Sequence, residues 1–420
     1  MSSVRAVRHT RTVKPVELSE IFIVPPYEDC PFCGSEDAFG LLSVEPHSFT
    51  KCCKKCSGAK RRELSRVSKA LIYLDQFAVS NLAKCIHPDY RERFVEGNPQ
   101  TQNGFWPKAF EALDRLQMLH VAACPQSTVH RAESVLNSRL REILRELYEH
   151  LSGHLAFRDP SQILDQQILK ALSSFLAGED FQLGERADVI DGPLDGWIDT
   201  LRISVDLGLQ ELEAEQAQKT KARAQEKLQA LFSEAQSQPR RDYRVFRDDY
   251  TACGPTWALN PYSPVGIAIM RRLDQEEVPI DERDELLREF LVSEQLRSVP
   301  AFRLKMCLLA AFAADAAGGR GSPPQGSMWF DIQGISAFLP YCDAILVDKQ
   351  CKRWLRTIAD HDDCPWPARI FSVDDTDAFL AYLQKLEEDA GPERRQLAIE
   401  VYGEQRLKPF SELYEWRDST

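Results

Sequence analysis

The chain has 420 residues, 43% of them hydrophobic, which is enough for one large folded core or two ordinary ones and argues against general disorder. Its formal net charge of −12 excludes a protein that simply coats nucleic acid through positive charge. The longest apolar run, residues 307–314, falls far short of the ~20 residues that a membrane span needs, and the basic first residues lack the apolar centre of a secretory signal. We therefore expect a cytoplasmic protein with no membrane partner, whose twelve cysteines are metal ligands and free thiols.

Positive charge is concentrated near the amino terminus. Residues 1–70 hold twelve Lys and Arg against eight Asp and Glu, whereas the rest of the chain is strongly acidic. Within that region, residues 51–70 hold eight basic residues and one acidic residue. Such a segment can attract phosphate groups even though the whole chain is negative.

Two Cys-x-x-Cys turns coincide with this basic region. Cys30 and Cys33 form the first turn, and Cys53 and Cys56 form the second, with nineteen residues between the turns. Each turn can direct two thiolates at one ion, and four sulfur ligands at about 2.3 Å complete the tetrahedral shell of a structural zinc site. Cys52 is an additional thiol, but only Cys53 has the two-residue gap to Cys56. We predict a small zinc ribbon that binds structural Zn²⁺.

The predicted ribbon defines an amino-terminal basic module, residues 1–69. Its basic side chains either contact nucleic-acid phosphates or are merely solvated, and the sequence leaves both readings open. The candidates for phosphate contact are Lys51, Lys54, Lys55, Lys60, Arg61 and Arg62.

A carboxylate directly follows the first strongly apolar segment after this module. The run ALIYL, residues 70–74, predicts a short buried strand, and residues 76–84 predict a helix, so Asp75 lies at the junction. In open parallel sheets the carboxyl ends of the strands form the ligand crevice. The alternative is that Asp75 only caps the next helix.

A second acid follows the next apolar segment. The run LHVAA, residues 119–123, predicts another strand, and Ser127 or Thr128 begins a long amphipathic helix. Glu133 lies in its first two turns, near the edge of the apolar stripe and close to His130. The alternative is a solvated glutamate that favours the positive end of the helix dipole.

Three further acids occur near the carboxyl terminus. Asp331 lies at the start of a predicted short helix, and the run AILVD, residues 344–348, predicts a strand that ends on Asp348. Asp343 stands at the entrance of that strand. A second apolar strand that ends in a carboxylate repeats the arrangement at Asp75.

These segments resemble the PIN-like nuclease superfamily. In that superfamily a first strand ends in Asp, a helix supplies a Glu, a later helix begins with Asp, and a following strand ends in Asp. The matching positions here are Asp75, Glu133, Asp331 and Asp348. The resemblance covers roughly residues 70–135 and 328–390, including a closing strand and helix. It implies an α/β fold of three layers with a mainly parallel central sheet.

The resemblance also implies a metal-dependent nuclease that hydrolyses phosphodiester bonds. Clustered carboxylates repel one another unless a cation neutralises them, and oxygen ligands favour Mg²⁺ or Mn²⁺. The expected ligands are the four matching acids, with Asp343 as a further ligand or as a neighbour of the ligands. Ser80 and Asn81, on the helix after Asp75, are candidates to contact a phosphate or a metal-bound water.

The chain departs from a compact PIN-like domain by a long insertion. The predicted domain spans residues 70–420, and its insertion, at about residues 150–327, is mostly helical. Residues 207–236 predict one long charged helix. One interpretation is a helix that packs by its ends or projects into solvent. The other is an arm that binds a second copy of the chain, nucleic acid or a regulatory protein. Just after it, Tyr243 and Phe246 are candidates to stack on single-stranded bases.

Together these features predict a metal-dependent endoribonuclease. RNA is preferred to DNA as the substrate because of the family resemblance, and a toxin or anti-phage defence effector is one setting that would require such an activity to be restrained. Two alternatives stay open. One is an inactive PIN-like module that binds nucleic acid or protein, and the other is a nuclease specific for DNA structures.

Overall fold

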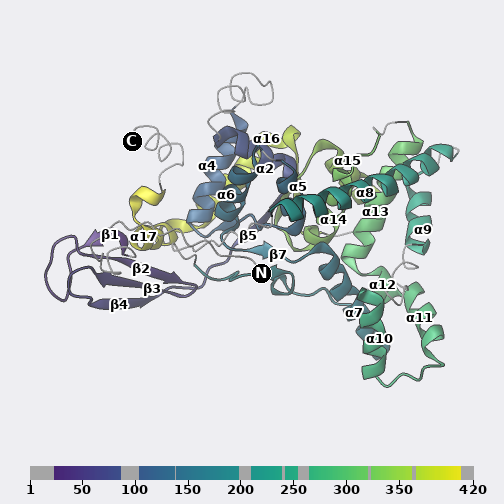
Figure 1. Cartoon of the computed structure of the whole chain (residues 1–420), viewed down its shortest axis with the longest axis horizontal. Coiled ribbons are helices and arrows are strands. Elements are labelled where there is room, and N and C mark those ends of the chain that lie inside the picture. The colour runs from purple at the N-terminus through teal and green to yellow at the C-terminus, as the bar shows by residue number, and fades with distance from the viewer. Residues whose placement is uncertain are drawn as a thin grey trace, which may run out of the picture. The chain divides into compact units, whose positions relative to one another are not determined.

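The computed structural model has an α/β architecture (Figure 1). It describes residues 23–86, 104–137, 139–197, 210–238, 242–253, 264–319, 323–361 and 366–407. No helix within these ranges is both long and apolar enough to cross a membrane.

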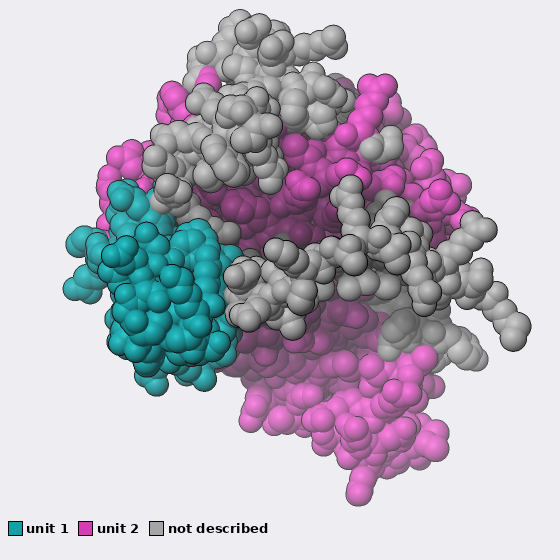
Figure 2. Space-filling model, turned by 60° about the vertical axis from the view of Figure 1, so that its left-hand side comes forward, with its two compact units in different colours: residues 1–67, 195–204, 392–408 teal, residues 68–194, 205–391, 409–420 magenta. Residues whose placement is uncertain are grey.

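The chain divides into two compact units, coloured separately in Figure 2. The first unit comprises residues 1–67, 195–204 and 392–408, and the second comprises residues 68–194, 205–391 and 409–420. The first unit therefore contains residues 1–67 of the predicted amino-terminal module, residues 1–69, together with two segments from much later in the chain.

The first unit contains a four-stranded antiparallel sheet in the order β1–β2–β3–β4. Its strands are β1 (Val24–Glu28), β2 (Phe39–Glu45), β3 (Ser48–Cys53) and β4 (Ala59–Glu63). Trp197 is fully buried in this unit, where its backbone N–H donates to the Pro46 carbonyl and its ring N–H donates to the Ser65 carbonyl. Its ring stacks with Tyr402 of α17 (Gly391–Tyr402), and the short helix η5 (Glu404–Leu407) follows.

The second unit is built on a parallel four-stranded sheet in the order β10–β9–β5–β6. Its strands are β5 (Ala70–Leu74), β6 (Ala122–Ala123), β9 (Ala344–Leu346) and β10 (Arg369–Phe371). Side chains of β5 alternate between two cores, with Leu71 and Tyr73 in one and Ile72 and Leu74 in the other. Because both faces are covered by helices, these strands appear in the sequence as continuous apolar runs.

Helices pack on both faces of this sheet. One face is covered by α2 (Gln76–Ile86), α4 (Phe105–Met118), α6 (Arg141–Ser152) and α16 (Thr376–Asp389). The other is covered by α7 (Pro160–Ala177), α13 (Pro300–Ala317), α14 (Ser327–Phe338) and α15 (Lys349–His361).

The region of the predicted insertion is mainly helical. A small antiparallel pair, β7 (Ala156–Phe157) and β8 (Ile190–Asp191), accompanies it. Its other helices are α8 (Gln210–Ser237), α9 (Tyr243–Cys253), α10 (Pro264–Gln275), α11 (Arg283–Val292) and α12 (Glu294–Arg297). Short 3-10 turns occur at η1 (Arg186–Asp188), η3 (Leu339–Tyr341) and η4 (Val373–Asp375).

Helix α8 packs along its length rather than by its ends. It lies against α13, α14 and α5 (Thr128–Leu136), all in view in Figure 1. The buried stripe of α8 consists of Ala217, Ala224, Leu228, Phe232 and Ala235. The middle of the helix is therefore held by small alanine side chains, and its charged residues cover the outer face.

Helix α9 continues the same core. Tyr243 and Phe246 are only 3% and 4% exposed and pack within the core of the second unit. The hypothesis that these rings stack on nucleic-acid bases is wrong, because a base cannot reach them.

Candidate functional site

The parallel pairing of β5 and β9 brings two acids to one edge of the sheet. Leu74 and Leu346, the last residues of the two strands, are register partners. Asp75 follows β5 and donates its backbone N–H to the Leu346 carbonyl over 3.0 Å, and Asp348 follows β9 by two residues. Both acids therefore lie at the carboxyl edge of the sheet, where ligands bind in open α/β folds.

Each of these acids also begins a helix. The Asp348 carboxylate accepts the Cys351 backbone N–H over 2.6 Å, and its carbonyl accepts the Lys352 N–H over 3.0 Å. The Asp75 carbonyl accepts the Ala78 N–H over 2.9 Å at the start of α2. Capping and clustering are thus compatible roles, because a carboxylate at the start of a helix keeps acceptor capacity for a second partner.

Helix α5 carries Glu133 to this edge. The Ser127 hydroxyl caps the helix by accepting the His130 backbone N–H over 3.2 Å. The His130 ring lies between the rings of Tyr73 and Tyr148, with centroid separations of 5.1 and 4.8 Å. Burial lowers the pKa of His130 to about 3, so this ring is neutral and acts as a packing element that fixes α5.

Neighbouring acids contribute to raised pKa values at three of the four matching acids, and Asp331 and Asp348 have carboxylate oxygens within 4.8 Å of each other. Burial and then the charges of Asp75, Glu133 and Asp348 hold the pKa of Asp331 well above its usual range. Burial and then Asp348 raise the pKa of Asp75 to about 6. Burial and then Asp75 raise the pKa of Glu133 to about 8, against the opposing charge of Lys221 on α8.

Three side chains in this region have buried polar atoms without hydrogen-bond partners in the described part of the chain. They are the Glu133 Oε2 atom, the Tyr73 hydroxyl and both ring nitrogens of His130. Unsatisfied buried polar atoms are rare in folded proteins. Oxygen donors that are mutually repulsive and incompletely paired form a set that fits a hard divalent cation such as Mg²⁺ or Mn²⁺.

The structure does not bring Asp343 to this cluster. It precedes β9 and so lies at the amino edge of the sheet, at the opposite end of the strand from Asp348. One carboxylate oxygen of Asp343 accepts the Leu71 backbone N–H over 2.8 Å, and the other accepts Arg186 over 2.9 Å. Asp343 therefore fixes the sheet, and the expectation that it binds or supports the metal is wrong.

Ser80 and Asn81 lie partly buried on α2, the helix that begins after Asp75. Ser80 accepts a hydrogen bond of 3.5 Å from the Gln76 side chain, and Asn81 accepts one of 3.4 Å from Lys84. Their expected contact with a phosphate or a metal-bound water stays a prediction.

A cavity of about 360 Å³ lies between α5 and α8, beside the acid cluster rather than in it. The Arg131–Glu213 ion pair, 2.5 Å long, joins the two helices there. The cavity is lined by Thr128, Arg131, Ala132, Val135, Leu212, Glu213, Gln216, Ala217 and Thr220, and none of the four acids lines it.

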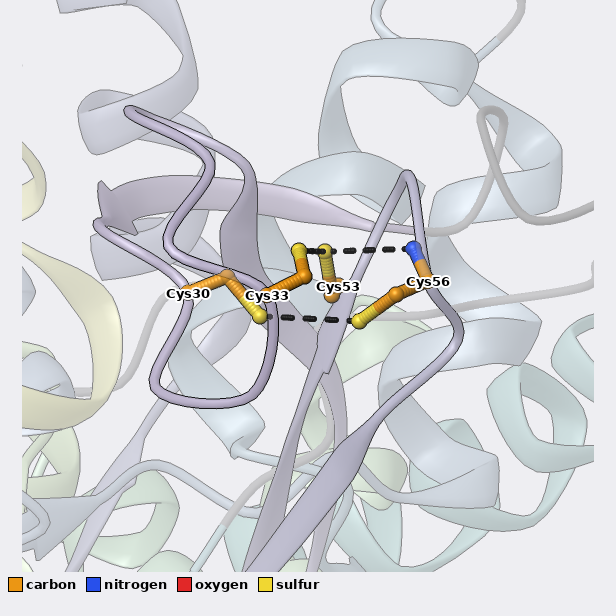
Figure 3. Close-up of side chains that lie close together, drawn as sticks. All are labelled: Cys30, Cys33, Cys53 and Cys56. Atoms are coloured by element: carbon orange, nitrogen blue, oxygen red, sulfur yellow. Dashed lines mark hydrogen bonds between the residues drawn. The ribbon is translucent and has the colours of Figure 1, made fainter.

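In the first unit, the four predicted zinc ligands converge (Figure 3). The sulfur atoms of Cys30 and Cys56 are 3.6 Å apart, and those of Cys33 and Cys53 are 3.8 Å apart. A tetrahedral zinc site with bonds of about 2.3 Å has sulfur–sulfur edges of about 3.8 Å. The four cysteines are therefore close enough to hold a metal ion, and their geometry is compatible with structural zinc.

Backbone N–H groups around these sulfurs favour thiolates. The N–H groups of Lys55 and Cys56 point at the Cys53 sulfur over 3.3 and 3.5 Å, and the Phe32 N–H points at the Cys30 sulfur over 3.4 Å. Thiolates are the form that binds metal, and donated hydrogen bonds stabilise their charge.

Position, and not acidity, separates the zinc ligands from the extra thiol. Hydrogen bonding, first of all by the Ser35 side chain, lowers the pKa of Cys33 to about 6, whereas burial and the other thiols of the cluster raise the pKa of Cys56 to about 12, and burial also raises the pKa of Cys52. Cys52 does not belong to the cluster of four. The two-residue gap thus identified Cys53 correctly.

The basic residues of the ribbon differ in their availability. Lys51 is 5% exposed and contacts Glu28, so the prediction that it contacts phosphate is wrong. Two arginines have acidic partners within the unit, since Arg61 pairs with Glu45 over 2.7 Å and Arg62 pairs with Glu400.

The lysines are more accessible. The Lys54 ammonium lies 3.6 Å from the centroid of the Tyr27 ring. Lys55 and Lys60 are exposed and have no side-chain partner among the described residues. These two lysines remain the best candidates of the six for phosphate contact.

Three residues near the acid cluster were not singled out from the sequence. Cys351 follows Asp348 by three residues, so helical spacing alone could have indicated it. Tyr73 belongs to an apolar strand and Lys221 to the inserted helix, and no local pattern assigns either to the site.

No family model, curated protein or solved structure matches this chain.

Proposed function

We propose that this chain is a metal-dependent nuclease of the PIN-like type that hydrolyses RNA phosphodiester bonds. Its site residues are Asp75, Glu133, Asp331 and Asp348. The observation that carries the proposal is the placement of acids at the carboxyl edge of a parallel sheet, with carboxylate oxygens of Asp331 and Asp348 within 4.8 Å of each other. Burial and then the charges of neighbouring acids raise the pKa values of three of the four. A fold that gathers acids in this way stores repulsion that a bound divalent cation offsets.

The order of the elements supports the family assignment. The acids follow β5, lie on α5, lie on α14 and follow β9, in the chain order typical of PIN-like domains. The closing pair, β10 and α16, completes the parallel sheet and one helical layer.

When bound, Mg²⁺ or Mn²⁺ would lower the pKa of a water and offset the negative charge that develops on the phosphate oxygens. The four acids would hold the ion. Asp75 is fixed by backbone hydrogen bonds on both sides, because Leu346 accepts its N–H and Ala78 donates to its carbonyl.

The surroundings of α2 orient this edge further. The Gln76 amide accepts the Tyr148 hydroxyl over 2.6 Å and donates to Ser134 over 3.4 Å, which ties α2 to α6 and α5. Lys221, whose charge acts on Glu133, would attract the phosphate backbone to an otherwise acidic site. A toxin or defence effector would need such an activity to be restrained, and the inserted helix α8 is placed to affect access from beside α5 and α14.

The test is cleavage of a mixed RNA pool by the purified full chain with added Mg²⁺ or Mn²⁺. Replacing Asp331 or Asp348 by Asn is expected to lower cleavage by on the order of 100-fold or more, because each change removes a ligand. Asp360→Asn, an exposed acid on α15, is the matched control and should cleave like the parent.

Parallel arms use single-stranded DNA and a flapped DNA duplex. Cleavage of DNA alone would replace the RNA assignment with a structure-specific DNA nuclease. RNA binding without metal-dependent cleavage would instead indicate an inactive binding module, and cleavage that survives in both Asn variants would refute the assigned site.

A further inference from the structure

A cysteine lies inside the acid cluster. Cys351 is in the first turn of α15, three residues after Asp348, and its side chain is 1% exposed. The Cys351 sulfur and one carboxylate oxygen from each of Asp331 and Asp348 lie within 4.8 Å of one another.

This position is different from that of an ordinary core cysteine. A buried free cysteine usually behaves as a small apolar side chain among other apolar groups. Cys342, just before β9, is fully buried and belongs to the same apolar core as Cys351. Unlike Cys342, Cys351 has its sulfur within 4.8 Å of one oxygen from each of two carboxylates, and the side chains of those two acids are partly exposed.

The Tyr73 hydroxyl provides an independent indication that something binds here. Tyr73 is 1% exposed, and its hydroxyl has no hydrogen-bond partner in the described part of the chain. A Cβ atom added to Gly334, one turn after Asp331 on α14, would lie 2.7 Å from this hydroxyl. An unsatisfied buried hydroxyl therefore lies beside α14, the helix that carries Asp331.

We propose that Asp331, Asp348 and Cys351 form a mixed oxygen and sulfur site for a thiophilic divalent cation of the Zn²⁺ class. The site shares two acids with the proposed nuclease centre and so rests on that placement, but ion binding does not require cleavage. Binding forms a sulfur–metal bond and releases the thiol proton to solvent, with no change of oxidation state. A thiolate ligand favours zinc over the hard ion Mg²⁺, and zinc therefore competes with Mg²⁺ for the shared acids.

Cadmium is the probe, because cadmium thiolates have an ultraviolet charge-transfer band that oxygen ligands do not produce. The full chain, with its ribbon loaded with zinc, is titrated with Cd²⁺ beside Cys351→Ser and the matched control Cys342→Ser. The parent and Cys342→Ser are expected to bind one more Cd²⁺ than Cys351→Ser and to show a correspondingly stronger band. Equal stoichiometry and equal bands in the parent and Cys351→Ser would overturn the proposal.

A second variant tests the site independently, in case Cys351→Ser does not fold. Asp348→Asn leaves the thiol in place but removes an oxygen ligand, and it should weaken the Cd²⁺ affinity by about 10-fold or more. Thermal melting of each variant shows whether it is folded. A folded Asp348→Asn variant with unchanged Cd²⁺ affinity would also contradict the mixed site.

Cleavage assays separate this inference from the proposed function. If the parent cleaves RNA, added Zn²⁺ should inhibit it, and Cys351→Ser should need about 10-fold more Zn²⁺ for the same inhibition. A Cd²⁺ signal that depends on Cys351, without any cleavage, would refute the nuclease and leave the ion site standing. Cleavage that depends on the four acids, without a Cys351-dependent Cd²⁺ signal, would support the nuclease and refute the ion site.

Discussion

At the scale of single residues, Asp75 and Glu133 combine burial with repulsion. Their pKa values are raised to about 6 and about 8, with burial as the first cause in each case. A raised pKa means that the folded protein binds these protons more tightly than the unfolded chain. The resulting stabilisation is complete below the unfolded values of about 4 and is lost as the pH rises through 6 to 8.

We predict that the chain without added divalent cations becomes less stable between pH 5 and pH 9. Glu133→Gln keeps a neutral side chain at every pH. It should therefore raise the melting temperature at pH 9 by on the order of 5 °C and make the melting temperature depend less on pH. Differential scanning calorimetry across this range tests the prediction, with Glu146→Gln, an exposed glutamate on α6, as the control. If the melting temperature falls with pH equally in Glu133→Gln and the parent, ionisation of Glu133 is not the cause of the pH dependence.

A second prediction concerns the close approach of Tyr73 to α14. Gly334→Ala places a Cβ atom 2.7 Å from the Tyr73 hydroxyl, which sits at the end of a rigid ring. We expect it to lower the free energy of unfolding by about 1–3 kcal/mol. Tyr73→Phe removes the oxygen, so in that background the same alanine should be stabilising, by about 0.5–1 kcal/mol, as in an ordinary helix interior. Urea unfolding of the double-mutant cycle measures the difference, and an equal loss in both backgrounds would show that the hydroxyl is not the obstacle.

At the scale of elements, buried strands were the most predictable feature. The run at residues 70–74 predicted β5 with its observed bounds, because a strand that is covered on both faces carries a continuous apolar sequence. The predicted strand at 344–348 is shorter in the structure, as β9 ends at Leu346, and the predicted strand at 119–123 is reduced to β6. Pairing decides these lengths, and pairing depends on residues far away in the sequence.

The helix predicted after residues 119–123 divides into α5 and α6. The apolar stripe runs through both helices, so periodicity alone did not reveal the break. Asn137 leaves the helical conformation, with φ −99° and ψ 82°, and its side chain accepts the Leu140 backbone N–H over 3.3 Å. A local side-chain turn thus competes with the helix, which is a known property of asparagine.

The direction of a strand explains the error at Asp343. The sequence showed an acid at each end of one strand, and a residue that precedes a parallel strand must lie at the opposite edge from one that follows it. The sequence therefore contained the information that excludes Asp343 from the acid cluster.

The packing of α8 could not be predicted in this way. Its contacts with other helices through Ala217 and Ala224 depend on residues far away in the sequence, which no local pattern contains.

We predict that the two roles of Asp348 can be separated. Asn also caps helices, so Asp348→Asn should keep the start of α15, whereas Asp348→Ala should lose about 1 kcal/mol more. Both variants lose the carboxylate, and both should lose metal-dependent cleavage. Urea unfolding and the RNA assay together test this, and equal stability of the two variants would show that the 2.6 Å bond to the Cys351 N–H is not a stabilising cap.

At the scale of the whole molecule, the two units differ in what the sequence revealed. The Cys-x-x-Cys spacing predicted the ribbon ligands, because metal geometry restricts them to a short local pattern. The contribution of Trp197 and α17 to the first unit was not predictable, since both come from segments far from the cysteines. The buried apolar cluster at the ligands is small: Ala38 and Phe39 pack with the ligands Cys30 and Cys53.

Because so few apolar groups surround the ligands, we expect a bound metal to stabilise this part of the first unit. Binding energy at a closed site of four thiolates contributes directly to folding, and small domains with little core depend on it. We therefore predict that, in a Cys351→Ser background that removes the second proposed ion site, elemental analysis of the purified protein finds one zinc ion per chain, lost on adding Cys53→Ser and retained on adding Cys52→Ser. The neighbouring cysteines make this a matched pair, because only Cys53 belongs to the cluster.

Loss of zinc should affect the two units unequally. The first unit has few apolar groups around its cysteines, whereas the second contains two extensive cores on the faces of its sheet. Limited proteolysis of Cys53→Ser, followed by mass spectrometry, should therefore show early cleavage within residues 24–63 while peptides from the parallel sheet stay protected. Full zinc content in Cys53→Ser, or uniform digestion of both units, would mean that the ribbon does not depend on the metal.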